Sequence, residues 1–597
     1  MPLFHRLLLA ALIAVGVVLV YDLFQAQIEQ PREAGRIVYD ADAGRFTFET
    51  PLEPVRIIYA SMFGPGEPVM RVREKWISKF ETEYAARLSE GRASELSPAD
   101  RAKCVAALLG RVKRSLPDFR RRMDDLAATD AARRGPATRA LAAWLEARGV
   151  VVRGSDPALD EAGRLHQALA GLEALARDAA PADKVTVAPR LTVSVERRWQ
   201  GRWVLSANRP RFLTGREVPD IIEGAKEELL ALVQDDYAVP LDVPLPGETL
   251  SPLDQPDTYG NPARRWRDAF IPSMLAQGSY ETAPPERRAH TYLATFTCFT
   301  YCLFYNEVLF RRAGIDKPPR TWPQFIAVCD KLKAAGIHPL TADMECYADA
   351  WLTWLIYRAV GPEAWMDTAL GKATAAAGGP RVSDPPWTDP RYREVFAQIR
   401  LLRERGYFDP AFAGSLWPAA QRAFASGSAA MMINGSWLVQ ELGGYQDVAS
   451  ADSFQLKCFS FPQWPGGRPE DQTAAYAIVS GLMVCRQGNA TRHAIELVKY
   501  LSARDHPDMV HKNSQISCMR DADFPPALAG IADDFRNAPR AYGDGPSIYA
   551  RRFWAAVLLP MYDTFFLAKK ASAGEFAARL KERTDAYLSR GGEGGYE

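Results

Sequence analysis

The sequence has no excess of either charge. Its 597 residues include 73 Lys and Arg against 72 Asp and Glu, which gives a formal net charge of +1 at pH 7. A protein that binds nucleic acid or an anionic membrane surface through its overall electrostatic field carries a strong excess of basic residues. This chain lacks such an excess, so no nucleic-acid partner is expected. A chain of this length is too long for one core, and we therefore expect two or more domains.

The common catalytic motifs are also missing. The sequence holds no GxSxG, no HExxH, no phosphate-binding GxxxxGK[ST] and no GxGxxG after an expected strand. Only seven histidines occur, and His290, His338 and His493 lie near expected helix ends, where a solvated or capping role is the simpler explanation. Acidic pairs such as Asp235-Asp236 lie in polar segments, which favours solvated surfaces over a glycosidase carboxylate pair. We expect neither an enzyme nor a bound cofactor or metal.

Paired cysteines of the redox or zinc type are absent as well. None of the eight cysteines forms a CxxC pair, and most lie in apolar segments such as "FIAVCDKL" and "GLMVCRQG". Buried free thiols are therefore expected rather than a disulfide framework. Cys298 and Cys302 are the best candidates for a bridge, although strand geometry can keep them apart.

The N-terminus holds the one long apolar run. Arg6 is followed by uncharged apolar residues from Leu7 to Tyr21, and Leu23 and Phe24 extend the run. Residues 1–27 are therefore expected to be a secretory signal or an uncleaved membrane anchor, with residues 7–24 as the tether. Either alternative predicts an exported protein, periplasmic or extracytoplasmic.

Strand and helix patterns alternate along most of the chain. Val55 to Tyr59 reads as a buried strand, and the Thr- and aromatic-rich segment 291–306 reads as strands. In the helix that follows Thr321, this residue and Gln324 predict a capping box, and Gly336 predicts the helix end. This alternation predicts an α/β fold in two lobes.

The segment from about residue 86 to residue 184 differs from the rest. Leu109, Leu116, Phe119, Met123 and Leu126 follow the 3,4 spacing of a helical seam, with Pro117 as a break or a kink. Several helices in a row without strands predict an inserted helical module. We expect it to leave from a loop, to leave the sheet intact, and to be dispensable for ligand binding.

Tryptophan follows a buried strand at one informative place. The apolar run Ala429 to Ile433 ends in Asn434-Gly435-Ser436, and Trp437 comes next. Core packing is one explanation for this ring. The other is that the turn carries the ring to the end of a strand, where ligands bind in open α/β sheets.

Four segments resemble one family and occur in its order. The chain is similar to the extracellular solute-binding proteins of ABC importers, the maltose-binding-protein-like sugar-binding class, over about residues 52–85 and 185–597. The matching segments are "REVPDII" (216–222), "YNEVLFRRAGIDKPPRTWPQFIAVCDKLKAAGIHPL" (305–340), "FASGSAAMMINGSW" (424–437) and "AIELVKYLSA" (494–503). The helical stretch departs from the usual family length.

The resemblance implies the two-lobed periplasmic-binding-protein fold of type II, with a hinge between the lobes. Strands near residues 299–306 and 475–480 would cross this hinge, and closure would bury the ligand. The implied boundaries are lobe 1 at 50–298 with the helical insertion at about 86–184, lobe 2 at 299–475, a return to lobe 1 at 476–540, and C-terminal helices of lobe 2 at 541–597.

The resemblance also implies where the ligand binds. Trp437 would stack on a sugar face, and Glu223 would accept hydrogen bonds from hydroxyl groups, although a solvent-exposed helix start is an equal alternative for Glu223. Trp554 is a rival to Tyr562 for a late aromatic contact. The complete set of expected ligand contacts is Ser61, Glu223, Phe299, Thr300, Asp343, Glu345, Tyr347, Trp437 and Tyr562.

Together these features predict an exported, monomeric substrate-binding protein of an ABC transporter. It would capture a carbohydrate between its lobes and deliver it to a permease in the inner membrane. One alternative is a ligand-sensing protein that hands its closed lobes to a membrane receptor. A secreted carbohydrate-active enzyme is a weaker alternative, because nothing in the sequence argues for catalysis.

Overall fold

The computed structural model describes residues 36–590 with internal gaps. The residues outside the description are 1–35, 43, 63–67, 93–97, 148–149, 155–159, 178–184, 198–202, 281–282, 343–347, 370–386, 388, 415–416, 444–453, 505–515, 544–550, 567–570 and 591–597. The expected N-terminal signal or anchor lies outside the described residues. Within the described part, no helix combines the length and the apolar character that crossing a membrane requires.

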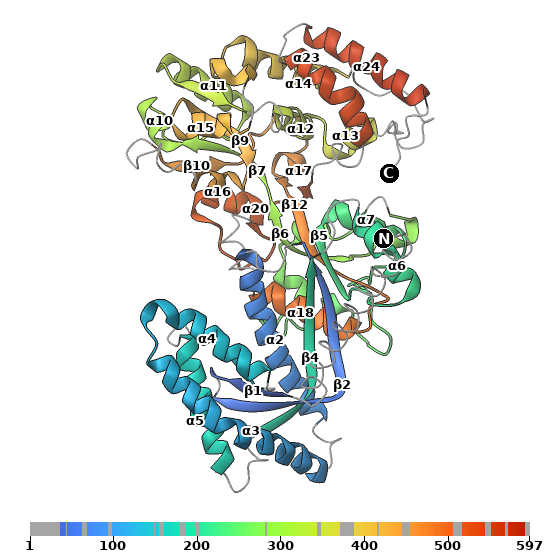
Figure 1. The fold of residues 1–597 in the computed structure, drawn as a ribbon. Helices are drawn as coiled ribbons and strands as arrows, with labels where there is room; N and C mark the ends of the chain where they lie inside the picture. Colours follow the sequence, from blue (N-terminus) through green and yellow to red (C-terminus); the bar gives the residue numbers. More distant parts are fainter. Residues whose placement is uncertain are drawn as a thin grey trace, which may run out of the picture.

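Lobe 1 is built on an eight-stranded sheet. Its strands run in the order β13-β6-β12-β5-β2-β1-β3, and β4 pairs with β2. Helices α2 (Pro68–Arg92), α7 (Lys226–Gln234) and α18 (Thr491–Arg504) pack around it (Figure 1). The strand bounds are β1 (Arg36–Asp40), β2 (Arg45–Ser61), β3 (Val150–Arg153), β4 (Val185–Arg197), β5 (Ile221–Ala225), β6 (Leu293–Phe299), β12 (Ile478–Val484) and β13 (Ile516–Ser517).

Lobe 2 is built on a smaller sheet. Four strands run in the order β10 (Leu456–Phe459), β7 (Tyr301–Asn306), β9 (Ala429–Gly435) and β8 (His338–Thr341). Every residue of β9 is buried, because helices cover this sheet and its strands therefore read as continuous apolar runs. The covering helices include α11 (Trp322–Ala334), α12 (Ala348–Ala359), α14 (Pro390–Glu404) and α24 (Ala573–Ser589). Figure 1 shows the two lobes one above the other, so the predicted two-lobed α/β fold is confirmed.

The chain passes between the lobes at extended segments. Strand β6 ends at Phe299 in lobe 1, and β7 begins at Tyr301 in lobe 2. On the way back, β11 (Ala475–Tyr476) leads directly into β12. Strand β14 (Ala541–Tyr542) pairs with β11 in parallel and adds a further link before the C-terminal helices. Both crossings predicted from the sequence lie at this place.

The inserted module is more than a set of helices. It contains α3 (Pro98–Ala127), α4 (Ala131–Glu146) and α5 (Glu161–Arg177), but also strand β3. The expectation of helices without strands is therefore wrong. The lobe 1 sheet is unbroken, as expected, but it is also longer than expected, because β1 and the first parts of β2 and β4 continue it into the module.

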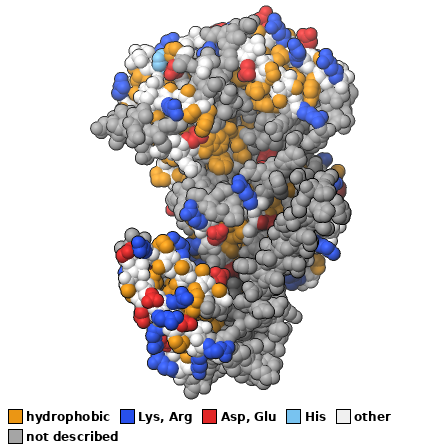
Figure 2. All heavy atoms as spheres, in the orientation of Figure 1, with side chains coloured by type: hydrophobic (Ala, Val, Ile, Leu, Met, Phe, Trp, Pro, Cys, Tyr) orange, Lys and Arg blue, Asp and Glu red, His pale blue; other side chains and the backbone are white. Residues whose placement is uncertain are grey.

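This module has a core of its own. Apolar side chains of β1, β2 and β3 pack there against Phe119 and Met123 of α3, Leu141 of α4 and Leu165 of α5. On the other side, α2 joins the module to lobe 1, because Glu81 accepts a hydrogen bond from Val193 N of β4 and pairs with Arg153 of β3 at 2.8 Å. Figure 2 shows charged side chains of both signs over the module, as expected for a solvated outer face.

Local sequence signals agree well with the structure. Thr321 and Gln324 form the predicted capping box of α11, and Gly314 and Gly336 adopt the positive φ that ends a helix. Helix α3 runs through Pro117 as a single element, so the predicted break is wrong. The six described cysteines, Cys298 and Cys302 among them, are free and buried, as predicted for thiols. Cys298 and Cys302 do not form a bridge.

Candidate functional site

Trp437 lies where the first crossing meets lobe 2. Strand β9 ends at Gly435, which pairs with Tyr301, the first residue of β7. The half-buried Trp437 ring lies edge-on to Phe299 and to Tyr301, each at 5.4 Å between ring centroids. It also covers Gly435 so closely that a Cβ on this glycine would overlap the ring. The turn therefore holds the ring at the end of a strand, between residues that belong to both lobes.

The other expected residues of this crossing lie beside Trp437. Thr300, between β6 and β7, is buried and donates its backbone N–H to Ser436 Oγ at 3.4 Å. Phe299 ends β6 and contacts Trp437. The structure therefore brings Phe299, Thr300 and Trp437 together, as the sequence predicted.

Glu223 and Ser61 lie inside lobe 1 instead of on its surface. Glu223 is 3% exposed and pairs with Arg73 of α2 at 2.6 Å. Its Oε2 accepts hydrogen bonds from Tyr59 at 2.7 Å and from Ser61 Oγ at 2.8 Å. Burial raises the pKa of Glu223. The positive charge of Arg73 and the hydrogen bonds from Arg73, Tyr59 and Ser61 lower it by more, so the pKa lies below its ordinary value of 4.5. The carboxylate of Glu223 therefore accepts its hydrogen bonds from protein groups in this structure, whereas the sequence predicted that it would accept them from ligand hydroxyl groups.

Another carboxylate lies nearer to the crossings and was not predicted. Glu227 is in the first turn of α7, directly after β5, and its Oε2 is buried without a hydrogen-bond partner among the described residues. The Tyr280 hydroxyl is likewise buried without such a partner, and burial, followed by the charge of Glu227, raises its pKa. Burial raises the pKa of Glu227 above 4.5. A Cβ on Gly543, just after β14, would lie 3.2 Å from Glu227 Oε1, which places this carboxylate against the hinge.

The remaining expected contacts fall elsewhere. Tyr562 is fully buried in lobe 2 and stacks on Phe566 at 5.2 Å, so its surroundings are those of a core residue. Trp554 is 7% exposed and packs against Trp365. Neither ring presents a free face in this arrangement. Asp343, Glu345 and Tyr347 lie outside the described residues.

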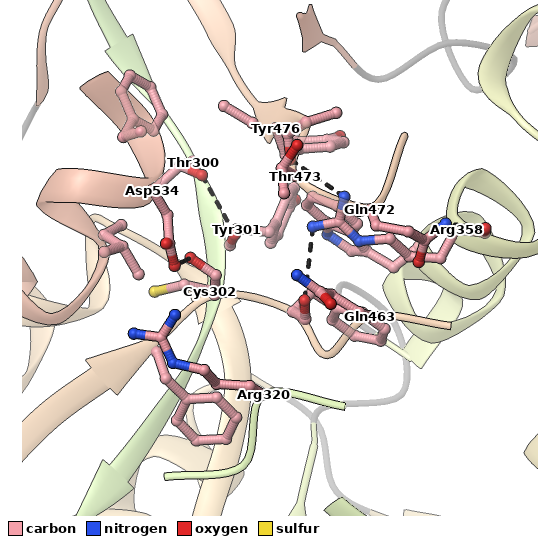
Figure 3. Close-up of a pocket in the computed structure, with 18 of the residues that line it drawn as sticks. Thr300, Tyr301, Cys302, Arg320, Arg358, Gln463, Gln472, Thr473, Tyr476 and Asp534 are labelled. Carbon is pink, nitrogen blue, oxygen red and sulfur yellow. Dashed lines mark hydrogen bonds between the residues drawn. The ribbon is translucent and has the colours of Figure 1, made fainter. Parts of the chain in front are cut away.

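A pocket lies on the opposite side of β7 from Trp437. The sheet order β10-β7-β9 places Trp437 on the β9 side, whereas the pocket is lined from the β10 side by Phe459, Ser460 and Phe461. Tyr301 and Tyr476 form a wall of this pocket, and their rings are 5.2 Å apart (Figure 3). The cavity volume is about 100 Å³.

The return segment helps to form this pocket. One wall is lined by Gly530 and Ile531 of η5 (Pro526–Ile531) and by Asp534 and Phe535 of α20 (Ala532–Arg536). Ser460 Oγ donates to Asp534 at 2.7 Å, which fastens α20 to the end of β10. Within the predicted return to lobe 1 at 476–540, β12 and β13 pair with strands of the lobe 1 sheet, whereas α20 is bonded to the end of β10 in lobe 2.

Two lobes joined by crossing strands, with an aromatic ring at a strand end beside the crossings, form the arrangement of a two-lobed binding protein. A family model described as "Bacterial extracellular solute-binding protein" matches residues 169–505. The chain belongs to this family. The description of this family names the binding of a solute.

Two curated relatives match parts of this solute-binding protein. The sn-glycerol-3-phosphate-binding periplasmic protein of Brucella abortus (strain 2308) is 31% identical over 171 residues, which are 28% of this chain and 35% of the relative. The Multiple sugar-binding protein of Streptococcus mutans serotype c is 23% identical over 249 residues, 40% of this chain and 51% of that protein. The chain thus matches about a third to a half of the length of these relatives.

A solved structure agrees over a longer stretch. The probable secreted solute-binding lipoprotein from Streptomyces coelicolor covers 89% of this chain and 99% of its own, with a TM-score of 0.51 and 14% sequence identity. At this identity the likeness shows the fold of the solute-binding protein and nothing finer.

Proposed function

We propose that this solute-binding protein captures a carbohydrate, a sugar or an oligosaccharide, between its two lobes and delivers it to an ABC permease in the membrane. The observation that carries the proposal is the placement of Trp437. Its half-buried ring stands at the end of β9, against Phe299 and Tyr301 of the first crossing. A ring in this position can cover the C–H face of a sugar, and closure of the lobes would bury it.

Polar groups near the crossings complement the ring. Glu227 and Tyr280 offer a carboxylate oxygen and a hydroxyl that have no hydrogen-bond partner among the described residues. Buried polar atoms of this kind are normally paired, and hydroxyl groups of a ligand would pair them. The name of the Streptococcus mutans relative, Multiple sugar-binding protein, also supports the carbohydrate proposal.

The partner and the location follow from the same proposal. We infer that the protein works as an exported monomer and that the apolar residues 7–24 tether it to the membrane. A tether would keep the lobes close to a permease, because residues 25–35, which lie between position 24 and β1, span at most about 40 Å. The closed lobes would form the surface that the permease binds.

A ligand screen tests the proposed substrate class. Ligands that bind only the folded state raise its melting temperature by mass action. The screen should contain mono- and oligosaccharides, amino acids as unrelated solutes, and sn-glycerol 3-phosphate, which the Brucella abortus relative binds according to its name. We expect a shift with at least one carbohydrate, and that shift should be lost in Trp437→Ala. Shifts with amino acids or sn-glycerol 3-phosphate alone would contradict the proposal.

A further inference from the structure

The pocket on the β10 side of β7 has an aromatic floor. Trp354, Phe459, Phe461 and Tyr476 line it and are all less than 5% exposed. Flat apolar rings suit the C–H faces of a small organic molecule better than they suit a hydrated ion. Figure 3 shows the polar residues that lie around this floor.

The rim of the pocket carries polar groups that are free to bind. The side chains of Arg320 and Gln463 make no hydrogen bond with any described residue, and both are exposed. Their backbones are joined, because Gln463 N donates to Arg320 O at 2.9 Å. The guanidinium and the amide are therefore held on adjoining parts of the rim, and Asp534 lines the wall formed by α20.

One buried group of the lining also lacks a partner. Arg358 is 3% exposed and donates from Nη1 to the carbonyl oxygens of Asp471 and Ala474 and from Nη2 to that of Phe461. Its Nε is buried without an acceptor among the described residues. An unpaired N–H at a buried guanidinium is costly, and Arg358 is one of the residues that line the pocket.

These features define the chemistry of an occupant. Donors come from Arg320, Gln463 and Arg358, and a carboxylate acceptor comes from Asp534. Guanidinium and carboxylate groups on one pocket favour a neutral molecule that both donates and accepts, which is the property of a polyol. A cavity of about 100 Å³ has room for several waters, since about 10–15 Å³ of cavity volume measured in this way holds one, and this room accommodates a short polyol.

We propose that this pocket is a second solute-binding site, separate from the cleft at Trp437, and that it takes a small neutral polyol. The two sites share Tyr301, whose ring contacts Trp437 on one side and Tyr476 on the other. The pocket is built from lobe 2, from the second crossing at Ala475 and Tyr476, and from α20. An occupant would therefore rest on the strand that links the lobes.

Saturation-transfer NMR with glycerol as the probe tests this site. Melting temperatures are unsuitable here, because polyols stabilise proteins without binding a site. The variants are Arg320→Ala/Gln463→Ala for the pocket, Trp437→Ala for the cleft, and Lys317→Ala as the matched control. Lys317 is exposed and close to Arg320 in the chain but does not line the pocket.

We expect glycerol signal with the unmodified protein, with Trp437→Ala and with Lys317→Ala, and a loss of at least three-quarters of it with Arg320→Ala/Gln463→Ala. Signal that disappears with Trp437→Ala and persists in the double variant would place glycerol in the cleft and overturn the second site. Absence of signal with the unmodified protein would overturn it as well. None of these outcomes depends on whether the cleft ligand is a carbohydrate.

Discussion

Ser436 and Thr300 are joined by two hydrogen bonds, one between their backbones and one from the Thr300 backbone to the Ser436 side chain. The N–H of Ser436 donates to the carbonyl oxygen of Thr300 at 2.8 Å, and the N–H of Thr300 donates to Ser436 Oγ at 3.4 Å. The residue directly before Trp437 is thereby fixed to the residue between β6 and β7. A rotation at this crossing would move the Trp437 ring together with the backbone that joins the lobes, so the proposed ligand contact would be linked to the position of the lobes.

Trp437→Ala should weaken ligand binding and leave the protein folded. Loss of the ring's contact area is expected to cost about 2–4 kcal/mol in binding. Isothermal titration calorimetry with the carbohydrate found in the screen measures this change. Trp417→Ala is the control, because Trp417 is 54% exposed and lies outside the crossings. Unchanged affinity in Trp437→Ala, or loss of its fold, would assign this ring to the core.

Gly435→Ala should displace the Trp437 ring. A Cβ at this position overlaps the Trp437 ring, so the ring has to leave its place beside Phe299 and Tyr301. We expect affinity to fall about tenfold or more, which corresponds to about 1.4 kcal/mol. Gly443→Ala is the matched control, since nothing lies within 4 Å of a Cβ there. Equal affinities for both variants would show that the ring's position does not matter for binding.

Features decided by neighbouring residues were predictable from the sequence. The capping box of α11 joins residues three apart, as predicted. The turn was predicted too early, because Asn434 and Gly435 are the last residues of β9 and the turn lies at Ser436 and Trp437. Trp437 still follows the end of the strand, as one of the two explanations from the sequence required. Such features need no knowledge of distant parts of the chain.

Features decided by distant residues were not predictable in this way. Glu223 was expected to face a ligand, but its partner Arg73 is 150 positions away and covers it inside lobe 1. Glu227 was not predicted because its position against the hinge is created by the segment after β14, which is more than 300 residues away in the chain. The module was predicted to contain only helices because the short strand β3 pairs with β1, which lies far away in the chain.

Arg73→Met should destabilise the protein strongly. The variant removes the cation from a pair whose carboxylate, Glu223, is almost fully buried. An uncompensated buried charge costs about 3–5 kcal/mol in the free energy of unfolding. Arg56→Met is the control, because Arg56 pairs with Glu217 at 3.0 Å with both side chains more than half exposed, and such pairs contribute about 1 kcal/mol or less. Urea unfolding at pH 7 compares the two variants, and equal losses would contradict a special role for Arg73.

The same pair predicts how stability depends on pH. The folded pKa of Glu223 lies below its ordinary value of 4.5. Its contribution is therefore present above pH 4.5 and is lost as the pH falls through the lower, folded pKa. The difference in unfolding free energy between the unmodified protein and Arg73→Met should shrink as the pH is lowered from 5 to 3. A difference that stays constant over this range would show that the Glu223 charge is not what Arg73 stabilises.

Ligand binding should close the lobes about the crossings. Strands β6–β7 and β11–β12 and the pairing of β11 with β14 form narrow links between two sheets that do not share strands. Small-angle X-ray scattering with saturating ligand should give a smaller radius of gyration than scattering without ligand. The Trp437→Ala variant at the same ligand concentration is the control and should remain open. An unchanged radius on saturation of the unmodified protein would contradict closure.

The helical module should be removable only together with its strands. Replacing residues 90–184 by a Gly/Ser linker takes away α3, α4, α5 and β3, and this uncovers Ile37, Tyr39 and Phe46, which are 2%, 6% and 6% exposed. Each such side chain is worth about 1.5–3 kcal/mol when buried. We therefore expect this deletion to aggregate, in contrast to the simple dispensable module that the sequence predicted.

A second deletion tests whether the boundary lies where the structure places it. This variant starts at Val55 and joins Arg92 to Leu191 by the same linker, so that β1 and the module parts of β2 and β4 are removed as well. The remaining parts of β2 and β4 keep their pairing from Val55 with Leu191 to Ser61 with Arg197. Glu81 loses Arg153 but still accepts from Val193 N, so α2 stays docked on β4. We expect soluble protein with near-normal affinity in calorimetry, whereas folded protein with lost affinity would show that the module contributes to the cleft.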